Sequence, residues 1–208
     1  MAPHPLYGPF RPGESPFRIK GTAYQGLFAS FDQRVPGGSK GVLARLEDPT
    51  VARFFEQPFL AGSTYDLLPL LEASQLAARV AGVPWREFVK GGARLQAERD
   101  LRGIYRMLLK LASPRMLVER LPRLLVQYFT FGSVEGRFSG ETRFEGAARG
   151  IPAPVAPWLA AICEGFVPTV MAAAGAPDSA VLIHPFEEDG EEQGMALLTT
   201  RFSVSWIA

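Results

Sequence analysis

The chain has 208 residues and a formal net charge of +1, and 47% of its residues are hydrophobic and 21% are charged. This length and composition indicate one soluble globular domain with a substantial core, and they exclude a disordered or fibrous protein. The near-neutral charge excludes a general electrostatic attraction to nucleic acid, so we expect no nucleic-acid partner.

The N-terminal segment indicates an arm in front of the domain. Residues 1–16 contain five prolines, whose rings prevent regular backbone hydrogen bonding. We therefore expect a proline-rich extended N-terminal arm over 1–16 and a single α+β domain over 17–208. The arm lacks the basic-then-apolar order of a secretory signal, and the single cysteine, Cys163, suits a reducing compartment. Both features favour a cytoplasmic location.

The first half of the domain has the periodicity of helices. A short strand is expected over 17–20, and a helix over 23–35 presents one apolar face made of Tyr24, Leu27, Phe28 and Phe31. Further helices are expected over 39–46, over 48–55, from Ser63 or Thr64 to Ala81, from Pro84 to about Leu101, over 104–111 and over 114–129. Ser39 and Asp48 are predicted N-caps, and Gly91–Gly92 should weaken or bend the helix that contains them.

The second half alternates short strands with one long apolar helix. Strands are expected over 133–138 and 142–146, joined by a Ser139–Gly140 turn. A strand over 179–186 and an acidic turn over 187–194 then precede a strand over 196–207. That last strand places Phe202, Val204 and Trp206 on one face and Arg201, Ser203 and Ser205 on the other.

The apolar helix runs from Ala156 to Gly175 and is the element around which the rest is arranged. Its length approaches that of a membrane span. Glu164, Gly165 and Pro168 interrupt it, however, and favour a kinked core helix with no membrane span. The order of elements predicts an α+β fold, in which a helical N-terminal half packs with a small antiparallel sheet built as hairpin, central helix, hairpin.

Several segments resemble a known family. The runs RLPRLLVQYFTFGSVEGRF, IPAPVAPW, EGFVPTVMAAAGA and KGTAYQGLFASF are similar to a myxobacterial paralogue family, a domain of unknown function of about this length. The resemblance covers roughly residues 17–206 and includes no catalytic motif. More distantly, the layout is similar to the superfamily of haem-nitric-oxide-binding and Golgi-transport-associated ligand-binding domains, which places a helical region beside a hairpin, helix, hairpin unit.

That distant resemblance raises the question of haem. A haem-binding member of the superfamily needs a helical imidazole as axial ligand and a Tyr-x-Ser-x-Arg run for the propionates. The only histidines here, His4 and His184, lie in the arm and in a predicted strand, and no such run is present. The chain has too few His and Cys residues for a structural zinc site. We expect neither a cofactor nor a metal.

Candidate functional residues are few. Cys163, His184 and Glu164 are the only residues from which a nucleophile, base and acid can be assembled, although neighbouring helix positions point about 100° apart. Glu164 either pairs with an arginine of the helical half or lines a pocket, and the pocket candidates are Cys163, Glu164 and Phe166. A basic helical face, with Arg94, Arg99, Arg102 and Arg106, is a candidate docking surface for an acidic partner such as residues 187–192 of a second copy.

Three function classes stay open. The main interpretation is a non-enzymatic regulatory or protein-interaction domain in signalling, with a protein partner or a homodimer. The alternative is a small-molecule sensor or carrier that binds an apolar ligand between the helices and the sheet. The second alternative is an enzyme of unknown class, for which the sequence shows no assembled site.

Overall fold

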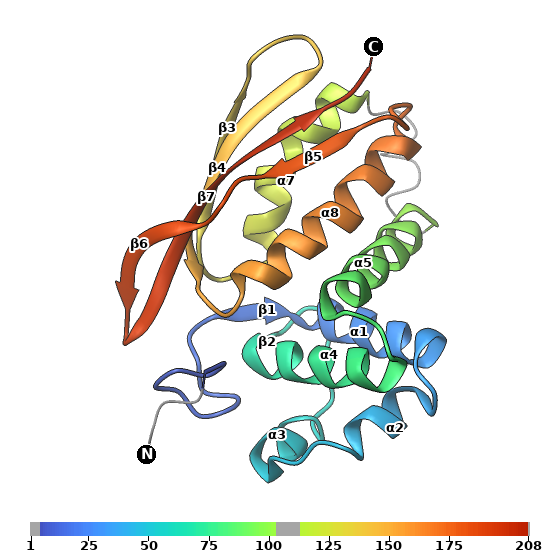
Figure 1. Ribbon diagram of the computed structural model, residues 1–208, viewed down its shortest axis with the longest axis vertical. Helices are drawn as coiled ribbons and strands as arrows, with labels where there is room; N and C mark the ends of the chain where they lie inside the picture. Colours follow the sequence, from blue (N-terminus) through green and yellow to red (C-terminus); the bar gives the residue numbers. More distant parts are fainter. Residues whose placement is uncertain (1–4, 103–112, 208) are drawn as a thin grey trace.

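The computed structural model describes residues 5–102 and 113–207, and it consists of a helical N-terminal half and a sheet-containing C-terminal half (Figure 1). The N-terminal half contains β1 (Arg18–Lys20), α1 (Gly21–Arg34), α2 (Gly38–Leu43), α3 (Pro49–Phe54), β2 (Thr64–Asp66), α4 (Leu68–Ala81), α5 (Trp85–Arg102) and α7 (Pro114–Tyr128). The C-terminal half contains β3 (Ser133–Phe138), β4 (Arg143–Pro152), α8 (Ala156–Ala173), β5 (Ala180–Ile183), β6 (Glu187–Glu192) and β7 (Met195–Ser205).

The larger sheet is antiparallel and has the order β3-β4-β7-β5, with β6 also paired to β7. The long strand β7 is therefore central, because β4 pairs along one side of it and β5 and β6 follow each other along the other. Helix α8 lies across one face of this sheet, and α5 covers the opposite side of α8 (Figure 1). The α+β architecture predicted from the order of elements is confirmed.

Helix α8 is a packed core helix. By length and composition it is the one helix within 5–102 and 113–207 that would suffice to cross a membrane. Its residues Ala161, Val170 and Met171 are buried against the rest of the chain. The predicted kink residue Pro168 lies inside the helix, which continues through it to Ala173.

The start of the long N-terminal helix was predicted wrongly. The predicted helix starts at Ser63 or Thr64, but residues 64–66 form β2, which pairs antiparallel with β1. The helix begins at Leu68, whose backbone N–H donates to the Asp66 carboxylate at 3.0 Å. Pairing with β1, which lies more than forty residues earlier in the chain, thus holds residues 64–66 in an extended conformation against their local helical pattern.

Two other details of the helical half differ from expectation. Ser39 is not an N-cap, because α2 begins at Gly38 and is preceded by Gly37 in the left-handed conformation. The Asp48 cap is confirmed, since its carboxylate accepts from the backbone N–H of Thr50 at 2.7 Å. The helix expected over 104–111 lies outside the described residues.

Glycines 91 and 92 do not end or break α5, which continues for ten residues beyond them. Their effect lies instead in packing. A Cβ at Gly92 would come within 3.2 Å of the Ser30 hydroxyl, and a Cβ at Gly91 within 2.7 Å of the Arg34 guanidinium. Gly92 therefore lets α1 approach α5 closely, whereas Gly91 lies only against the end of the Arg34 side chain.

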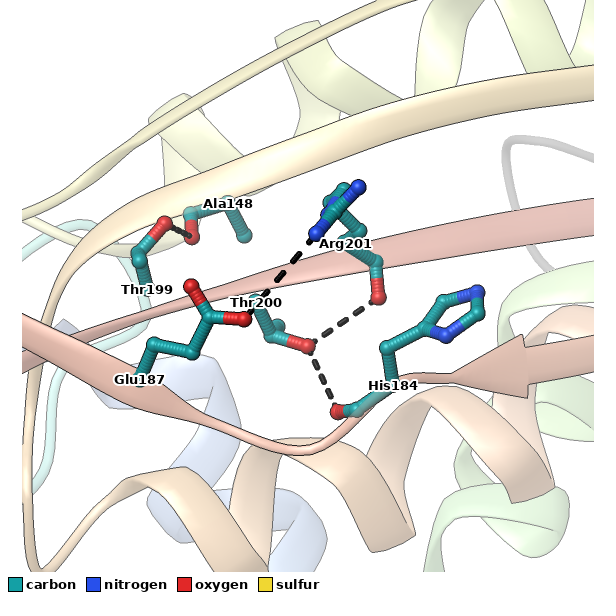
Figure 2. A network of polar contacts seen from close by, with 6 residues as sticks. All are labelled: Ala148, His184, Glu187, Thr199, Thr200 and Arg201. Atoms are coloured by element: carbon teal, nitrogen blue, oxygen red, sulfur yellow. Dashed lines mark hydrogen bonds and ion pairs between the residues drawn. The ribbon is translucent and has the colours of Figure 1, made fainter.

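The acidic segment after β5 is a strand and not a turn. Glu187 to Glu192 pairs with β7 as β6, so the turn shortens to the residues between Glu192 and Met195. Between β5 and β6 the residues 184–186 interrupt the pairing with β7. Figure 2 shows that there the Thr200 hydroxyl of β7 donates to the backbone oxygen of His184 at 2.7 Å.

The predicted alternation at the last strand is confirmed at Arg201, Val204 and Trp206 but not at Ser203. Val204 and Trp206 are buried and Arg201 is exposed, as expected. Ser203, expected on an open face, is only 5% exposed. It is enclosed because β7 is central, with Glu145 of β4 and Leu182 of β5 as its neighbours on the two sides.

The described part of the N-terminal arm is docked on the helical half. Asp66 receives hydrogen bonds from the backbone N–H of Gly13 at 2.8 Å and of Ser15 at 3.1 Å, and from the Ser15 hydroxyl at 2.5 Å. The Tyr7 ring is buried, and its hydroxyl donates to Glu72 at 2.8 Å. Buried aromatic and polar contacts, rather than regular secondary structure, hold the arm in place.

Candidate functional site

A cavity of about 280 Å³ lies between the helices and the sheet. Its walls come from α1, α4, α5, α7 and α8 and from the inner face of the sheet, so segments from both ends of the chain meet around it. Most of the lining side chains are aliphatic or aromatic, among them Leu27, Phe88, Leu117, Leu121, Phe129, Trp158, Leu159, Ile162, Phe166, Val170, Val181, Phe202 and Val204. The arrangement forms an apolar chamber in the middle of the fold.

Helix α8 supplies one wall because of its spacing. Leu159, Ile162, Phe166 and Val170 recur at steps of three and four residues and all line the cavity. Residues at such steps share one face of a helix. The strand β7 supplies a second wall in the same way, with Thr200, Phe202 and Val204 at the two-residue period of a strand.

The three predicted pocket residues divide between two faces of α8. Cys163 and Phe166 line the cavity. Glu164 does not, and its carboxylate pairs instead with the guanidinium of Arg86 on α5, whose Nε donates to it at 3.2 Å. These contacts support the structural interpretation of Glu164, in which it pairs with an arginine from the helical half.

The cysteine in the cavity wall is protonated at neutral pH. Burial raises the pKa of the Cys163 thiol to about 12, and the nearby Glu164 charge adds to this effect. Because the thiolate is the nucleophile and the metal ligand, Cys163 acts here as a small apolar wall residue.

One corner of the cavity is polar, and the sequence analysis did not identify it. The lining includes Thr22 and Ser30 of α1 and Gln96 and Asp100 of α5. The Gln96 amide donates to the Asp100 carboxylate at 2.8 Å. Burial raises the pKa of Asp100, although the Gln96 hydrogen bond and the Arg99 charge oppose the shift. Only the pairing of α1 with α5, which no local pattern encodes, brings these residues to one place.

The hypothetical catalytic trio is not assembled. Cys163 lines the cavity, Glu164 faces Arg86, and His184 is exposed after the end of β5. Within the described residues, no hydrogen bond joins any two of them, and no group of three or more His, Cys, Asp or Glu side chains is placed to hold a metal ion. His4 lies outside the described residues.

The predicted basic face is only partly exposed. Arg94 is exposed on α5, but Arg99 turns inward and donates to the backbone oxygen of Leu95 at 3.2 Å and of Gly26 at 3.4 Å. Arg102 is the last residue of α5, and Arg106 lies outside the described residues. The docking of this face on an acidic surface stays a prediction.

Comparison with known proteins places the fold. Solved structures of haem-nitric oxide/oxygen binding (H-NOX) domains superpose on most of the chain. The Fe(II) unliganded H-NOX protein of K. algicida has a TM-score of 0.62 at 11% identity and covers 91% of this chain and 97% of its own. The chain has the H-NOX fold. A single-substitution mutant of the T. tengcongensis H-NOX has a TM-score of 0.58 at 10% identity, with 91% of this chain and 98% of its own covered.

A third H-NOX structure adds a functional description of its own protein. An oxygen-binding H-NOX domain related to soluble guanylate cyclases, in its oxygen complex, has a TM-score of 0.58 at 8% identity and covers 91% of this chain and 96% of its own. No protein-family model matches the chain, and no curated protein matches it. The resemblance to the myxobacterial family is therefore unsupported, whereas the distant resemblance to the haem-nitric-oxide-binding superfamily is supported at the level of the fold.

The described residues around the cavity do not fit a haem of the H-NOX kind. None of them is a histidine, and the Cys163 thiol is held protonated. None is a lysine or arginine, so the described wall offers no cation to the two carboxylates of a haem. Besides Cys163, the described wall contains one side chain of a type that commonly holds haem iron, the phenol of Tyr128.

Proposed function

We propose that this chain is a non-enzymatic sensor or carrier domain that binds a small, predominantly apolar molecule in the cavity between its helices and its sheet. The observation that carries the proposal is the apolar cavity of about 280 Å³. Ligand pockets in proteins are apolar chambers of a few hundred Å³ with a small number of polar groups, and this cavity has that character.

The energetic argument is that an empty cavity of this size is unfavourable. Side chains that line an empty space lack contact partners on one side, so they lose part of their dispersion energy. Binding of an apolar molecule restores the missing contacts, and any ligand that binds only the folded state stabilises it.

The fold supports a signalling role for the cavity. The structural neighbours include an oxygen complex of a domain related to soluble guanylate cyclases, in which the same architecture holds a small ligand. A sensor differs from a carrier by passing ligand occupancy to a partner, and α8 is suited to this because it touches both the cavity and α5. The alternative function from the sequence thus has more support than the main one, since Arg99 of the proposed docking face is turned inward.

The test compares two substitutions of the same kind on α8. Ala160 lines the cavity, whereas Ala172 is exposed on the same helix. We expect the wild-type protein to bind the neutral apolar dye Nile red in titrations followed by fluorescence. We expect Ala160→Leu, which fills the cavity, to weaken that binding at least tenfold and Ala172→Leu to leave it unchanged.

Native mass spectrometry of the freshly purified protein provides the second readout. We expect a retained small molecule in the wild type and less of it in Ala160→Leu. Circular dichroism establishes that both variants are folded. A wild-type protein that retains nothing and binds no dye contradicts the proposed function, as does a folded Ala160→Leu variant that binds like the wild type.

A further inference from the structure

The register of α1 against α5 places specific residues opposite each other. The Arg34 guanidinium donates to the backbone oxygen of Phe88 at 2.6 Å. One turn earlier on α1 and one turn later on α5, a Cβ at Gly92 would lie 3.2 Å from the Ser30 hydroxyl. The two helices are therefore antiparallel, and each turn toward the start of α1 matches a turn toward the end of α5.

The next two turns complete the pattern. A Cβ at Gly26 would lie 2.3 Å from Oε1 of Gln96, so these two residues are opposite each other. The following turn brings Thr22 opposite Asp100. Both of these residues line the cavity, as do Gly26 and Gln96. Thr22, Gln96 and Asp100 thus form one group, which we name the polar corner.

The hydrogen bonding of the polar corner is incomplete. The Thr22 hydroxyl oxygen is buried and has no hydrogen-bond partner among the described residues. The bond from Gln96 to Asp100 uses one carboxylate oxygen, which leaves the second carboxylate oxygen as an acceptor. Buried polar groups are almost always satisfied, so an unpaired one indicates a partner outside the described residues, such as a bound ligand or an ordered water.

We propose that the ligand of this cavity is an uncharged apolar molecule with one hydroxyl group, such as a medium-chain alcohol, whose hydroxyl occupies the polar corner between Thr22 and Asp100. The hydrocarbon part lies along the apolar wall of α8, beside Ile162 and Phe166. This inference rests on the proposed function and specifies the chemistry of its ligand.

The hydrogen-bonding groups of the corner select a hydroxyl over other end groups. A threonine hydroxyl both donates and accepts, whereas an ionised carboxylate only accepts. A ligand hydroxyl satisfies both partners at once, because it accepts from Thr22 and donates to Asp100. An ether or ketone oxygen only accepts, so it leaves the carboxylate oxygen unpaired.

Charged end groups fit less well. A ligand carboxylate would face the Asp100 carboxylate, and none of the described residues lining the cavity is a lysine or arginine. An ammonium group would meet Asp100 favourably, but it would lose its hydration in an apolar chamber where burial already raises the Asp100 pKa. The neutral hydroxyl avoids both costs.

The first test is a series of ligands with one chain length. Isothermal titration calorimetry of the wild-type protein with octanol, octyl methyl ether, octanoate and octylamine compares end groups on the same hydrocarbon. We expect octanol to bind about tenfold more tightly than the ether, as the loss of one buried hydrogen bond predicts, and more tightly than either charged compound. This comparison needs no variant, so it does not depend on the folding of a mutant.

The second test removes the threonine hydroxyl. Thr22→Val replaces the hydroxyl by a methyl group of similar size and should reduce octanol affinity about fivefold to tenfold, and the affinity of the ether by a similar factor, because the ether oxygen also accepts from Thr22. Thr22→Ser should restore octanol binding. Thr199→Val is the matched control, because the Thr199 hydroxyl donates to the Ala148 backbone oxygen at 3.0 Å (Figure 2) and Thr199 is not among the residues that line the cavity.

The outcomes separate this inference from the proposed function. If octanol and the ether bind equally and Thr22→Val binds octanol like the wild type, the cavity binds ligands but the polar corner does not select them, and the inference is wrong. Tighter binding of octanoate or octylamine than of octanol overturns it as well. If no compound of the series binds and Nile red also fails to bind, the proposed function itself is contradicted.

Discussion

The contact between α5 and α8 provides a sharp test of the packing around the cavity. Gly165 of α8 lies directly against α5, and a Cβ built on it would stand 2.3 Å from the backbone oxygen of Lys90 and 2.9 Å from Cβ of Ala93. The Lys90 oxygen is a backbone atom of α5, and the Ala93 Cβ is attached directly to that backbone. Rotation of a side chain therefore cannot remove either steric clash. We predict that Gly165→Ala destabilises the protein.

The sign of this effect is unusual for a glycine inside a helix. Replacement of a helical glycine by alanine ordinarily stabilises a protein by about 1 kcal/mol. Ordinary van der Waals contact begins at 3.4 Å, so the two helices must separate by about 1 Å. Overpacking of this kind costs about 1–3 kcal/mol, and the close approach to a backbone oxygen places it at the upper end. The net destabilisation should be about 1–2 kcal/mol.

The assay is thermal and urea unfolding followed by circular dichroism. A loss of about 1–2 kcal/mol lowers the melting temperature of a domain of this size by about 2–8 °C. Gly91→Ala in α5 is the matched control, since the added Cβ meets only the end of the Arg34 side chain, at 2.7 Å. That variant should be neutral or more stable. A Gly165→Ala protein as stable as the wild type would show that α5 and α8 do not pack as described.

Three further predictions concern the arm, the cysteine and haem. Asp66→Ala should destabilise the protein by roughly 3 kcal/mol in urea unfolding, because it leaves the N–H groups of Gly13 and Ser15 unpaired. Limited proteolysis of this variant should then cut the arm, and an arm that stays protected refutes the role of Asp66. Cys163 should resist iodoacetamide at pH 8 and react faster as the pH rises toward its pKa of about 12, since only the thiolate reacts; rapid labelling of the folded protein at pH 8 contradicts the burial of the thiol. Addition of haemin should give no Soret band beyond that of free haemin, and a band that disappears in Tyr128→Phe would instead identify a phenolate ligand.

Local interactions explain the elements that could be predicted from the sequence. The helical face of Tyr24 and Phe31, the Asp48 cap and the αL glycine that ends α4 at Gly82 all depend on residues a few positions apart. The overall α+β architecture followed from the order of these elements. The candidate site was predicted in part, because Cys163 and Phe166 are on the apolar face of a helix that had to be buried.

Strand pairing and tertiary contacts explain the errors. Residues 64–66 carry a helical pattern but pair with β1, and the acidic residues 187–192 carry a turn composition but pair with β7. The partner of residues 64–66 lies more than forty residues earlier in the chain, whereas residues 187–192 form a hairpin with the strand that follows them. In both segments strand pairing satisfies the backbone hydrogen-bonding groups, and this gain outweighs a weak local preference. Glu164 was predicted as a pocket candidate, but it pairs with Arg86, seventy-eight residues away in the chain, and no local pattern reveals that partner.

The sequence by itself determined the positions of most helices and strands and the core location of α8, since hydrophobic periodicity and caps act over a few residues. Only the tertiary structure decided where the space between those elements lies and what lines it. The register of α1 against α5 places Thr22 opposite Asp100 at the cavity, and glycines at 26 and 92 let the two helices approach closely in that register. That register depends on the shapes of two whole helix surfaces, and no single stretch of sequence encodes it.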